Sequence, residues 1–247
     1  MMGRLTNSIR RRGDLALALG FAAASLALAA PVSAQAYQCS LPRTASVPTI
    51  ARDGPERQMP VTGYTLAVSW SPELCRTREG DSGQARQCSG RSGRFGFVLH
   101  GLWPDGARGW PQWCWPDVRP TGPEIATQLC RSPSARLVAR QWAKHGACMT
   151  RSPRTYYRVS AILYDGLRWP DFDRLSRKPD LTAGDVRDWF AAANRGWPPG
   201  AVGVKLNARG WLEELRLCYD RRFMPSRCDR GRFGPADEAA VKIWRGL

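Results

Sequence analysis

Residues 97–105 read Phe-Val-Leu-His-Gly-Leu-Trp-Pro-Asp. Aromatic and β-branched residues dominate the run before His100, so we expect a β-strand over residues 94–100. Beyond the histidine, the run continues into a tryptophan, a proline and an aspartate. The segment therefore predicts a strand of the central sheet that ends in a titratable side chain.

The chain has 247 residues and only one other histidine, His145, which lies in residues 142–148, Trp-Ala-Lys-His-Gly-Ala-Cys. Two histidines suffice for metal-free cleavage of RNA. One imidazole accepts the proton of a ribose 2′-hydroxyl, and the other donates a proton to the departing 5′-oxygen. Histidine suits both steps because its unperturbed pKa lies near neutral pH. Two structural histidines are the alternative, and the residues around them weigh against it.

The segment before His145 predicts a helix over residues 134–144, with Ser134 as its N-cap. Gln141, Lys144 and His145 stand at i, i+3 and i+4, which places them on one face of that helix. Arg140 lies one turn before Lys144 and flanks them. A charged, solvated helix face is the alternative, and for Lys144 alone it would be the better one. Its adjacency to His145 favours a site.

Further strands are expected over residues 61–70 and in a hairpin of residues 201–206 and 211–219, with its turn at 207–210. Further helices are expected over 155–167, with Thr155 as N-cap, and over 183–193. Strands and helices do not alternate regularly. We therefore predict an α+β fold with a mainly antiparallel central sheet flanked by helices. Residues 235–247 fit either a short helix or a tail.

The N-terminal residues 1–36 have the pattern of a signal peptide: a basic start, an apolar run and a small-x-small cleavage site. A retained membrane anchor is the alternative, but the apolar run is short for one. Residues 37–60 predict an N-terminal arm, and 61–247 a single domain. We expect an exported protein, periplasmic or secreted, without stable membrane association after cleavage.

The cysteine count of eight agrees with export, because an even number in an exported chain implies disulfides. Cys75 with Cys88 is a plausible local loop, and Cys218 with Cys228 is expected across a turn. A zinc site is the competing interpretation. It fails on spacing, because no Cys-x-x-Cys pair exists and the two histidines are far apart. We expect no metal.

The formal charge is +16, and arginine carries nearly all of it. Such a surface attracts a polyanion, and the arginine fork can bind phosphate oxygens in two places. An acidic membrane surface is the alternative partner, so charge alone favours nucleic acid only weakly.

The segments 97–104 and 142–148 resemble the two active-site segments of the ribonuclease T2 family. Residues 66–75 and 212–218 are also similar to that family and occur in its order, so the resemblance covers residues 61–228. It implies an endoribonuclease with little base specificity, acting on single-stranded RNA without a metal or cofactor. It also implies a bridge from Cys148 to Cys114 or Cys130.

The resemblance assigns roles to matching positions. His145 would be the general base and His100 the general acid, with the roles reversed when water opens a 2′,3′-cyclic phosphate to a 3′-phosphate. Lys144 would stabilise charge on the phosphate. The family usually has glutamate at Gln141 and often histidine at Arg140. Both changes predict a lower pKa for His145, hence a more acidic optimum than Gln141→Glu would show.

Base recognition is also implied by the resemblance. Trp103 and Asp105 would line a nucleobase pocket, with Trp103 stacking and Asp105 accepting a hydrogen bond from an exocyclic amine. Trp110 is expected to be a second wall. Core packing is the alternative for Trp103.

Because the 2′-hydroxyl is the nucleophile, DNA would not be a substrate. We expect a monomer. A catalytically weak T2-fold protein that binds RNA or another polyanion is the alternative function, and a secreted phosphodiesterase acting on other phosphate esters is a third.

Overall fold

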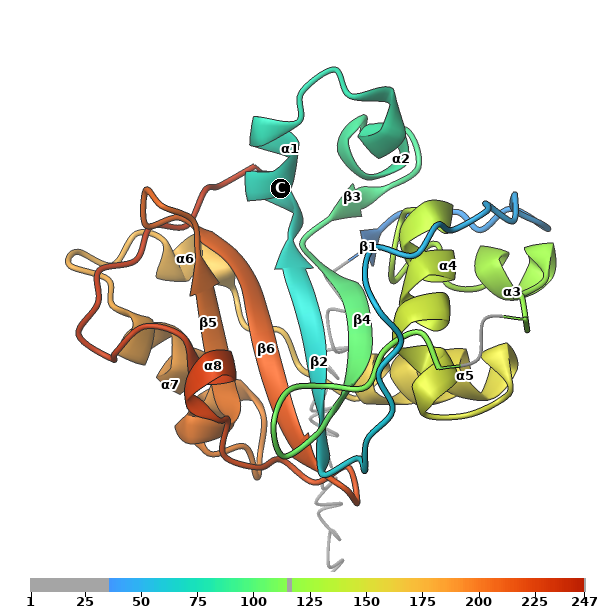
Figure 1. Ribbon diagram of the computed structural model, residues 1–247. Coiled ribbons are helices and arrows are strands. Elements are labelled where there is room, and N and C mark those ends of the chain that lie inside the picture. The colour runs from blue at the N-terminus through green and yellow to red at the C-terminus, as the bar shows by residue number, and fades with distance from the viewer. Residues whose placement is uncertain (1–35, 115–116, 247) are drawn as a thin grey trace, which may run out of the picture. The chain divides into compact units, whose positions relative to one another are not determined.

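A four-stranded antiparallel sheet forms the centre of the fold (Figure 1). The computed structural model describes residues 36–114 and 117–246. The strands lie in the order β4 (Phe97–Asp105), β2 (Gly63–Trp70), β6 (Leu212–Asp220) and β5 (Val202–Leu206). A second, two-stranded sheet joins β1 (Ala36–Tyr37) to β3 (Arg94–Phe95). The predicted α+β class with an antiparallel central sheet is confirmed.

Helices flank the central sheet at both of its edges (Figure 1). Beside β4 lie α3 (Gly122–Ala126), α4 (Ala135–Lys144) and α5 (Pro153–Asp165). Toward β5 lie α6 (Phe172–Leu175), α7 (Ala183–Ala193) and α8 (Arg230–Phe233). The remaining helices are α1 (Ser71–Thr77), α2 (Ala85–Cys88) and short 3-10 turns at Ser82–Gln84, Gly146–Cys148 and Pro199–Ala201.

The longer helices agree closely with the sequence predictions. Ser134 caps α4 by accepting a hydrogen bond from the Leu137 amide at 3.3 Å. The N-cap predicted for α5 is wrong. Ser152 accepts from the amide of Thr155 at 3.3 Å, and the helix begins at Pro153, since proline is favoured in a first turn.

The two faces of the central sheet differ because side chains alternate along each strand. One face carries the hydrophobic core. The core residues of the sheet are Leu66, Val68, Leu99, Leu102, Val202, Val204, Leu215 and Leu217. The opposite face, here called the site face, carries Thr65, Glu214 and Arg216 on β2 and β6.

A β-bulge interrupts the pairing of β2 with β4 at His100. Ala67 pairs with Gly101, whereas the next residue, Val68, pairs with Leu99, so His100 is the extra residue. In a regular strand, residues three apart point to opposite faces. The bulge cancels that alternation, and His100 and Trp103 therefore share the site face.

Four disulfides connect the chain, and none of the cysteines is free. The pairs are Cys39–Cys130, Cys75–Cys88, Cys114–Cys148 and Cys218–Cys228. Both local pairs predicted from the sequence are confirmed, and the partner of Cys148 is Cys114. The bond to Cys39 anchors the N-terminal arm beside α3.

The ends of the chain add little regular structure. The predicted signal peptide lies outside the described residues except for Ala36, which pairs with Phe95. After α8, residues 235–246 contain no further helix, and Ala240 and Lys242 bridge to Thr182 and Trp211. Among the described helices, none combines the length and apolar character needed to cross a membrane.

Candidate active site

His100 lies on the site face against a buried carboxylate. Its Nδ1 is 2.7 Å from Oε2 of Glu214, whose side chain is only 4% exposed. The other oxygen of Glu214 accepts a hydrogen bond from Nε of Arg216 at 3.1 Å. Because a carboxylate can only accept, Nδ1 of His100 carries the proton in this pair. Nε2 of His100 is then the nitrogen available to a substrate.

Glu214 remains charged despite its burial. Burial alone would raise the pKa of its carboxyl, but the hydrogen bond and charge of His100, aided by Arg216, outweigh it and bring that pKa to about 2. This ionised carboxylate accepts the Nδ1 proton of His100 and fixes the orientation of the imidazole ring.

His145 terminates α4, and several contacts fix that helix end. Trp113 donates its backbone N–H to the carbonyl oxygen of Lys144 at 2.8 Å, and the adjacent Cys114 is bonded to Cys148. A Cβ on Gly146 would lie 2.7 Å from the Tyr156 ring, so only glycine allows this close packing. The loop and the helix end therefore hold His145 in place.

The surroundings of His145 disfavour its charged form. The residue is 8% exposed, and its Nδ1 is buried without a hydrogen-bond partner among the described residues. Burial and the positive charges of Lys144, His100, Arg140 and Arg232 lower the pKa of His145 from 6.5 to about 3. The neutral imidazole is therefore the stable form at ordinary pH.

Trp103 lies between the two histidines. Its ring centroid is 5.2 Å from that of His100 and 5.6 Å from that of His145. The indole N–H donates to Oε1 of Gln141 at 2.7 Å, and a Cβ on Gly101 would lie 2.3 Å from that oxygen. Glycine at 101 is therefore required for the contact between strand and helix.

Lys144 and Arg140 lie side by side, and both form ion pairs with the carboxylate of Asp53 in the N-terminal arm. Nζ of Lys144 is 2.9 Å from Oδ1 of Asp53, and Arg140 also pairs with Asp53. The hydrogen bond from Lys144 lowers the pKa of the Asp53 carboxyl. Asp53 thus lies where an anionic group of a ligand would bind.

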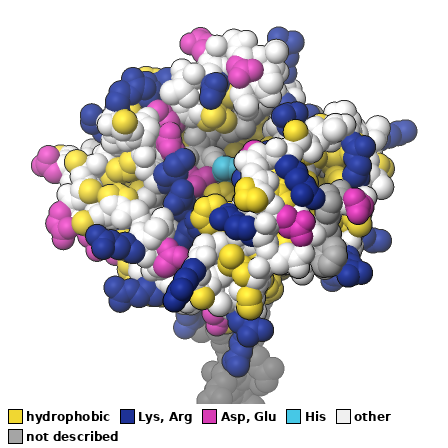
Figure 2. Space-filling model, in the orientation of Figure 1, with side chains coloured by type: hydrophobic (Ala, Val, Ile, Leu, Met, Phe, Trp, Pro, Cys, Tyr) yellow, Lys and Arg dark blue, Asp and Glu magenta, His cyan; other side chains and the backbone are white. Residues whose placement is uncertain are grey.

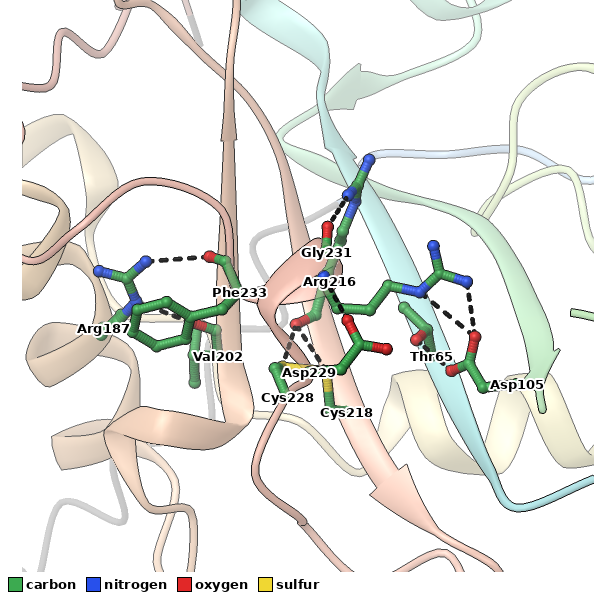
Figure 3. The surroundings of a disulfide bond; sticks show 11 residues. Thr65, Asp105, Arg187, Val202, Arg216, Cys218, Cys228, Asp229, Gly231 and Phe233 are labelled. Carbon is green, nitrogen blue, oxygen red and sulfur yellow. Dashed lines mark hydrogen bonds and ion pairs between the residues drawn. A yellow bond between two sulfur atoms is a disulfide. The ribbon is translucent and has the colours of Figure 1, made fainter. Parts of the chain in front are cut away.

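Asp105 is paired with Arg232 of α8. Its Oδ1 is 2.6 Å from Nη2 of Arg232, and its Oδ2 accepts from the Thr65 hydroxyl at 2.5 Å. Figure 3 shows this carboxylate beside Thr65, with a guanidinium bound to it. Trp110 contacts Arg57, whose guanidinium carbon is 4.5 Å from its ring centroid, and its N–H donates to Gln112.

The surface above these residues is hollowed. Figure 2 shows a histidine side chain at the bottom of a hollow, with lysine and arginine side chains along its rim. Two imidazoles in opposite electrostatic environments, beside cations, can together accept one proton and donate another at a phosphate group.

Comparison with known proteins identifies the family. Residues 62–172 match the sequence model of the ribonuclease T2 family. The chain is 32% identical over 188 residues to a probable ribonuclease of Haemophilus influenzae, covering 71% of this chain and 64% of that protein. It is 36% identical over 101 residues to a ribonuclease of Aeromonas hydrophila, covering 40% and 43% respectively. The chain belongs to the ribonuclease T2 family.

The T2 fold agrees with solved structures. Trichomaglin, described as a novel S-like ribonuclease, superposes with a TM-score of 0.57 at 19% identity, covering 74% of this chain and 97% of its own. At such identity the likeness concerns the fold. The chain spans less than two thirds of the length of the two bacterial relatives.

The structure brings together most of the site residues predicted from the sequence. His100, Gln141 and His145 meet around Trp103, and the charges of Lys144 and Arg140 act on His145. Asp105 and Trp110 join them through Arg232, whose guanidinium carbon is 5.7 Å from the Trp103 centroid and 5.5 Å from that of Trp110. Trp103 is half-buried, so its ring is not wholly within the core.

Three residues of the site escaped the sequence prediction: Glu214, Arg232 and Asp53. Glu214 lies within one of the T2-like stretches, and two consecutive glutamates in a strand place one of them on each face. That pattern was a usable signal for a buried acid. Arg232 follows the matched segment, and Asp53 precedes it, in parts of the chain without periodicity.

Within the described residues, no group of three or more histidine, cysteine, aspartate or glutamate side chains is arranged to hold a metal ion. All eight cysteines are in disulfides, and His100 is committed to Glu214.

Proposed function

We propose that this protein is an endoribonuclease that cleaves single-stranded RNA with little base specificity, through a 2′,3′-cyclic phosphate to 3′-phosphate ends. The observation that carries the proposal is the contrast between the two histidines. His145 is held neutral by burial and cations, whereas His100 is bound to an ionised Glu214. A neutral imidazole that can accept a proton thus lies near an imidazole that a carboxylate orients.

In the first step, neutral His145 takes the proton of the 2′-hydroxyl. The 2′-oxygen attacks phosphorus, and the bond from phosphorus to the 5′-oxygen breaks. His100 donates the proton of Nε2 to that departing oxygen. Glu214 is a positioning residue here, because it fixes the Nδ1 proton and stabilises the imidazolium.

In the second step the roles reverse. His100, now neutral, accepts a proton from water, which attacks the cyclic phosphate. His145, now protonated, returns its proton to the 2′-oxygen as the ring opens. Protonated His145 is disfavoured by its surroundings, so it gives up its proton readily.

Lys144 and Arg140 would bind the phosphate oxygens and stabilise the charge that develops on them. This requires that Asp53 gives way to the substrate, since it now holds both cations. Gln141 orients Trp103 through its side-chain oxygen and so supports the ring between the histidines.

The mechanism uses the 2′-hydroxyl as nucleophile, so DNA should not be cleaved, and it requires neither a metal nor a cofactor. We also propose that the protein is exported to the periplasm or the medium as a monomer, after removal of residues 1–36. The arm of residues 37–60 and the domain of 61–247 would remain. Four disulfides support an oxidising compartment.

The test is cleavage of homopolymeric RNA by the oxidised protein in EDTA from pH 4 to 8, with His100→Ala and His145→Ala alongside. We expect cyclic phosphate products from the parent protein and none from either variant. RNA that is bound but left intact throughout would contradict the proposal and favour a polyanion-binding protein. Cleavage of an RNA blocked at the 2′-oxygen would instead indicate a general phosphodiesterase.

A further inference from the structure

In the base pocket expected around Trp103 and Asp105, the Asp105 carboxylate is not a free hydrogen-bond acceptor. Both oxygens of Asp105 are already hydrogen-bonded. Oδ1 receives Nη2 of Arg232 at 2.6 Å and its Nε at 3.2 Å, and Oδ2 receives the Thr65 hydroxyl at 2.5 Å. Both side chains of the ion pair are 17% exposed. An exocyclic amine would have to compete with a charged, two-point partner for this acceptor.

The group that Asp105 leaves available is a hydrogen-bond donor. Asp105 uses the Nε and Nη2 edge of the Arg232 guanidinium. Nη1 has no hydrogen-bond partner in the described part of the chain, so the end formed by Nη1 and Nη2 still offers a fork of N–H groups. The guanidinium carbon lies over the Trp103 ring, 5.7 Å from its centroid, so a base that binds at this ring meets both groups.

Arg232 is held rigidly in this place, although α8 is only one turn long. Its amide donates to the Asp229 carboxylate at 2.7 Å, and Cys228 is bonded to Cys218 on β6 (Figure 3). A Cβ on Gly203 would lie 2.0 Å from the carbonyl oxygen of Arg232, so α8 packs directly on β5. A preorganised donor loses little entropy when it binds a ligand.

We propose that Arg232 recognises the base stacked on Trp103 and gives the enzyme a preference for guanine. The inference rests on the proposed function, because it concerns the RNA pocket of that site. Guanine presents O6 and N7 as two adjacent acceptors that match an arginine fork. Adenine and cytosine place an amino group on the corresponding edge, where it meets donors. Cleavage at other bases continues, so the preference is a bias within broad specificity.

Binding of the four nucleoside 5′-monophosphates, measured by calorimetry, tests the inference without relying on catalysis. We expect 5′-GMP to bind the parent protein about tenfold more tightly than 5′-AMP. Arg232→Gln should abolish that preference and move it toward adenine and cytosine, since it frees the Asp105 carboxylate as an acceptor. Arg230→Gln is the matched control, because Arg230 lies in the same helix but is exposed, and it should keep the guanine preference.

Equal weakening of all four nucleotides by Arg232→Gln would indicate a phosphate contact and overturn the proposal, as would binding that Arg232→Gln leaves unchanged. If that variant does not fold, Arg232→Lys keeps a cation for Asp105 but lacks the fork, and it should also lose the preference. Cleavage of the set of dinucleoside monophosphates is a separate measurement. Absence of all cleavage with the guanine preference intact would refute the proposed function and leave Arg232 recognition standing.

Discussion

The two histidines lie against the same tryptophan but in opposite surroundings. His100 stands on the sheet, its side chain is 32% exposed, and it shares a hydrogen bond with Glu214. His145 ends a helix, is 8% exposed, and has Lys144 as its neighbour in the chain. A buried negative charge therefore lies beside His100, and a group of positive charges lies around His145.

The division into acid and base is set by the neighbours of the two histidines and not by the histidines themselves. β6 supplies the carboxylate for His100, and α4 supplies the cations for His145. Titratable groups whose environments push their protonation apart are the usual sign of an acid and base pair. Substitutions of the neighbours should therefore change the rate, KM or pH dependence of cleavage by degrees, whereas loss of either histidine should abolish cleavage.

Lys144→Ala should have the largest effect. Loss of a charge that stabilises the phosphate should lower kcat by about a hundredfold. It also removes a cation that lowers the pKa of His145, so the acidic limb of the pH profile should move to higher pH. Lys178→Ala is the control, since that lysine pairs with Asp185 on the surface. Unchanged kcat from steady-state cleavage assays would refute the phosphate role.

Glu214→Gln should weaken the action of His100 as the general acid. The amide no longer offers a charged acceptor to Nδ1 of His100, so the imidazole is oriented less firmly and kcat should fall about tenfold. Glu213→Gln is a close control, because Glu213 pairs with Lys205 and is 37% exposed. Equal kcat values for the two variants would contradict a positioning role.

Gln141→Glu should reduce the contrast between the histidines. The new carboxylate can still accept from Trp103, and its charge should raise the pKa of His145 above about 3. Because the base must be neutral, activity is lost as pH falls through that pKa. The acidic limb and the optimum should therefore move to higher pH. An optimum that stays in place or becomes more acidic would refute this prediction.

Asp53→Asn should have the smallest effect and the opposite sign. Without the carboxylate, Lys144 and Arg140 are free for phosphate, so KM should fall about threefold while kcat hardly changes. The effect should shrink in high salt because the arm contact is exposed. Glu56→Gln in the same arm is the control, being 40% exposed and apart from these cations. A raised KM would show that Asp53 supports the site.

The sequence predicted the parts of the site that lie close together in the chain. Gln141, Lys144 and His145 share a helix face through their spacing alone. Long-range partners have no such signal. Glu214 lies 114 residues from His100, and its contact depends on strand order and on a bulge that a strict period of two does not anticipate. The bulge also explains why His100 and Trp103, three positions apart, share a face.

Short elements that are held by tertiary contacts could not be predicted from the sequence either. Arg232 lies in a four-residue helix, which has no periodic pattern and depends on a disulfide and on contact with Gly203. The arm was expected, but the pairing of Asp53 with Lys144 depends on where the arm crosses α4. Helix α7, by contrast, has the predicted bounds, 183–193, and a capping box of Thr182 and Asp185 fixes its start.

An NMR titration of the imidazole signals would show directly whether the two histidines differ in protonation. The chain has two histidines, so two imidazoles give all of the signals, and His145→Ala assigns them. The signal lost in that variant should stay in the neutral form far below pH 6.5 and titrate near pH 3. Two imidazoles that titrate together near pH 6.5 would contradict the division into a base and an acid.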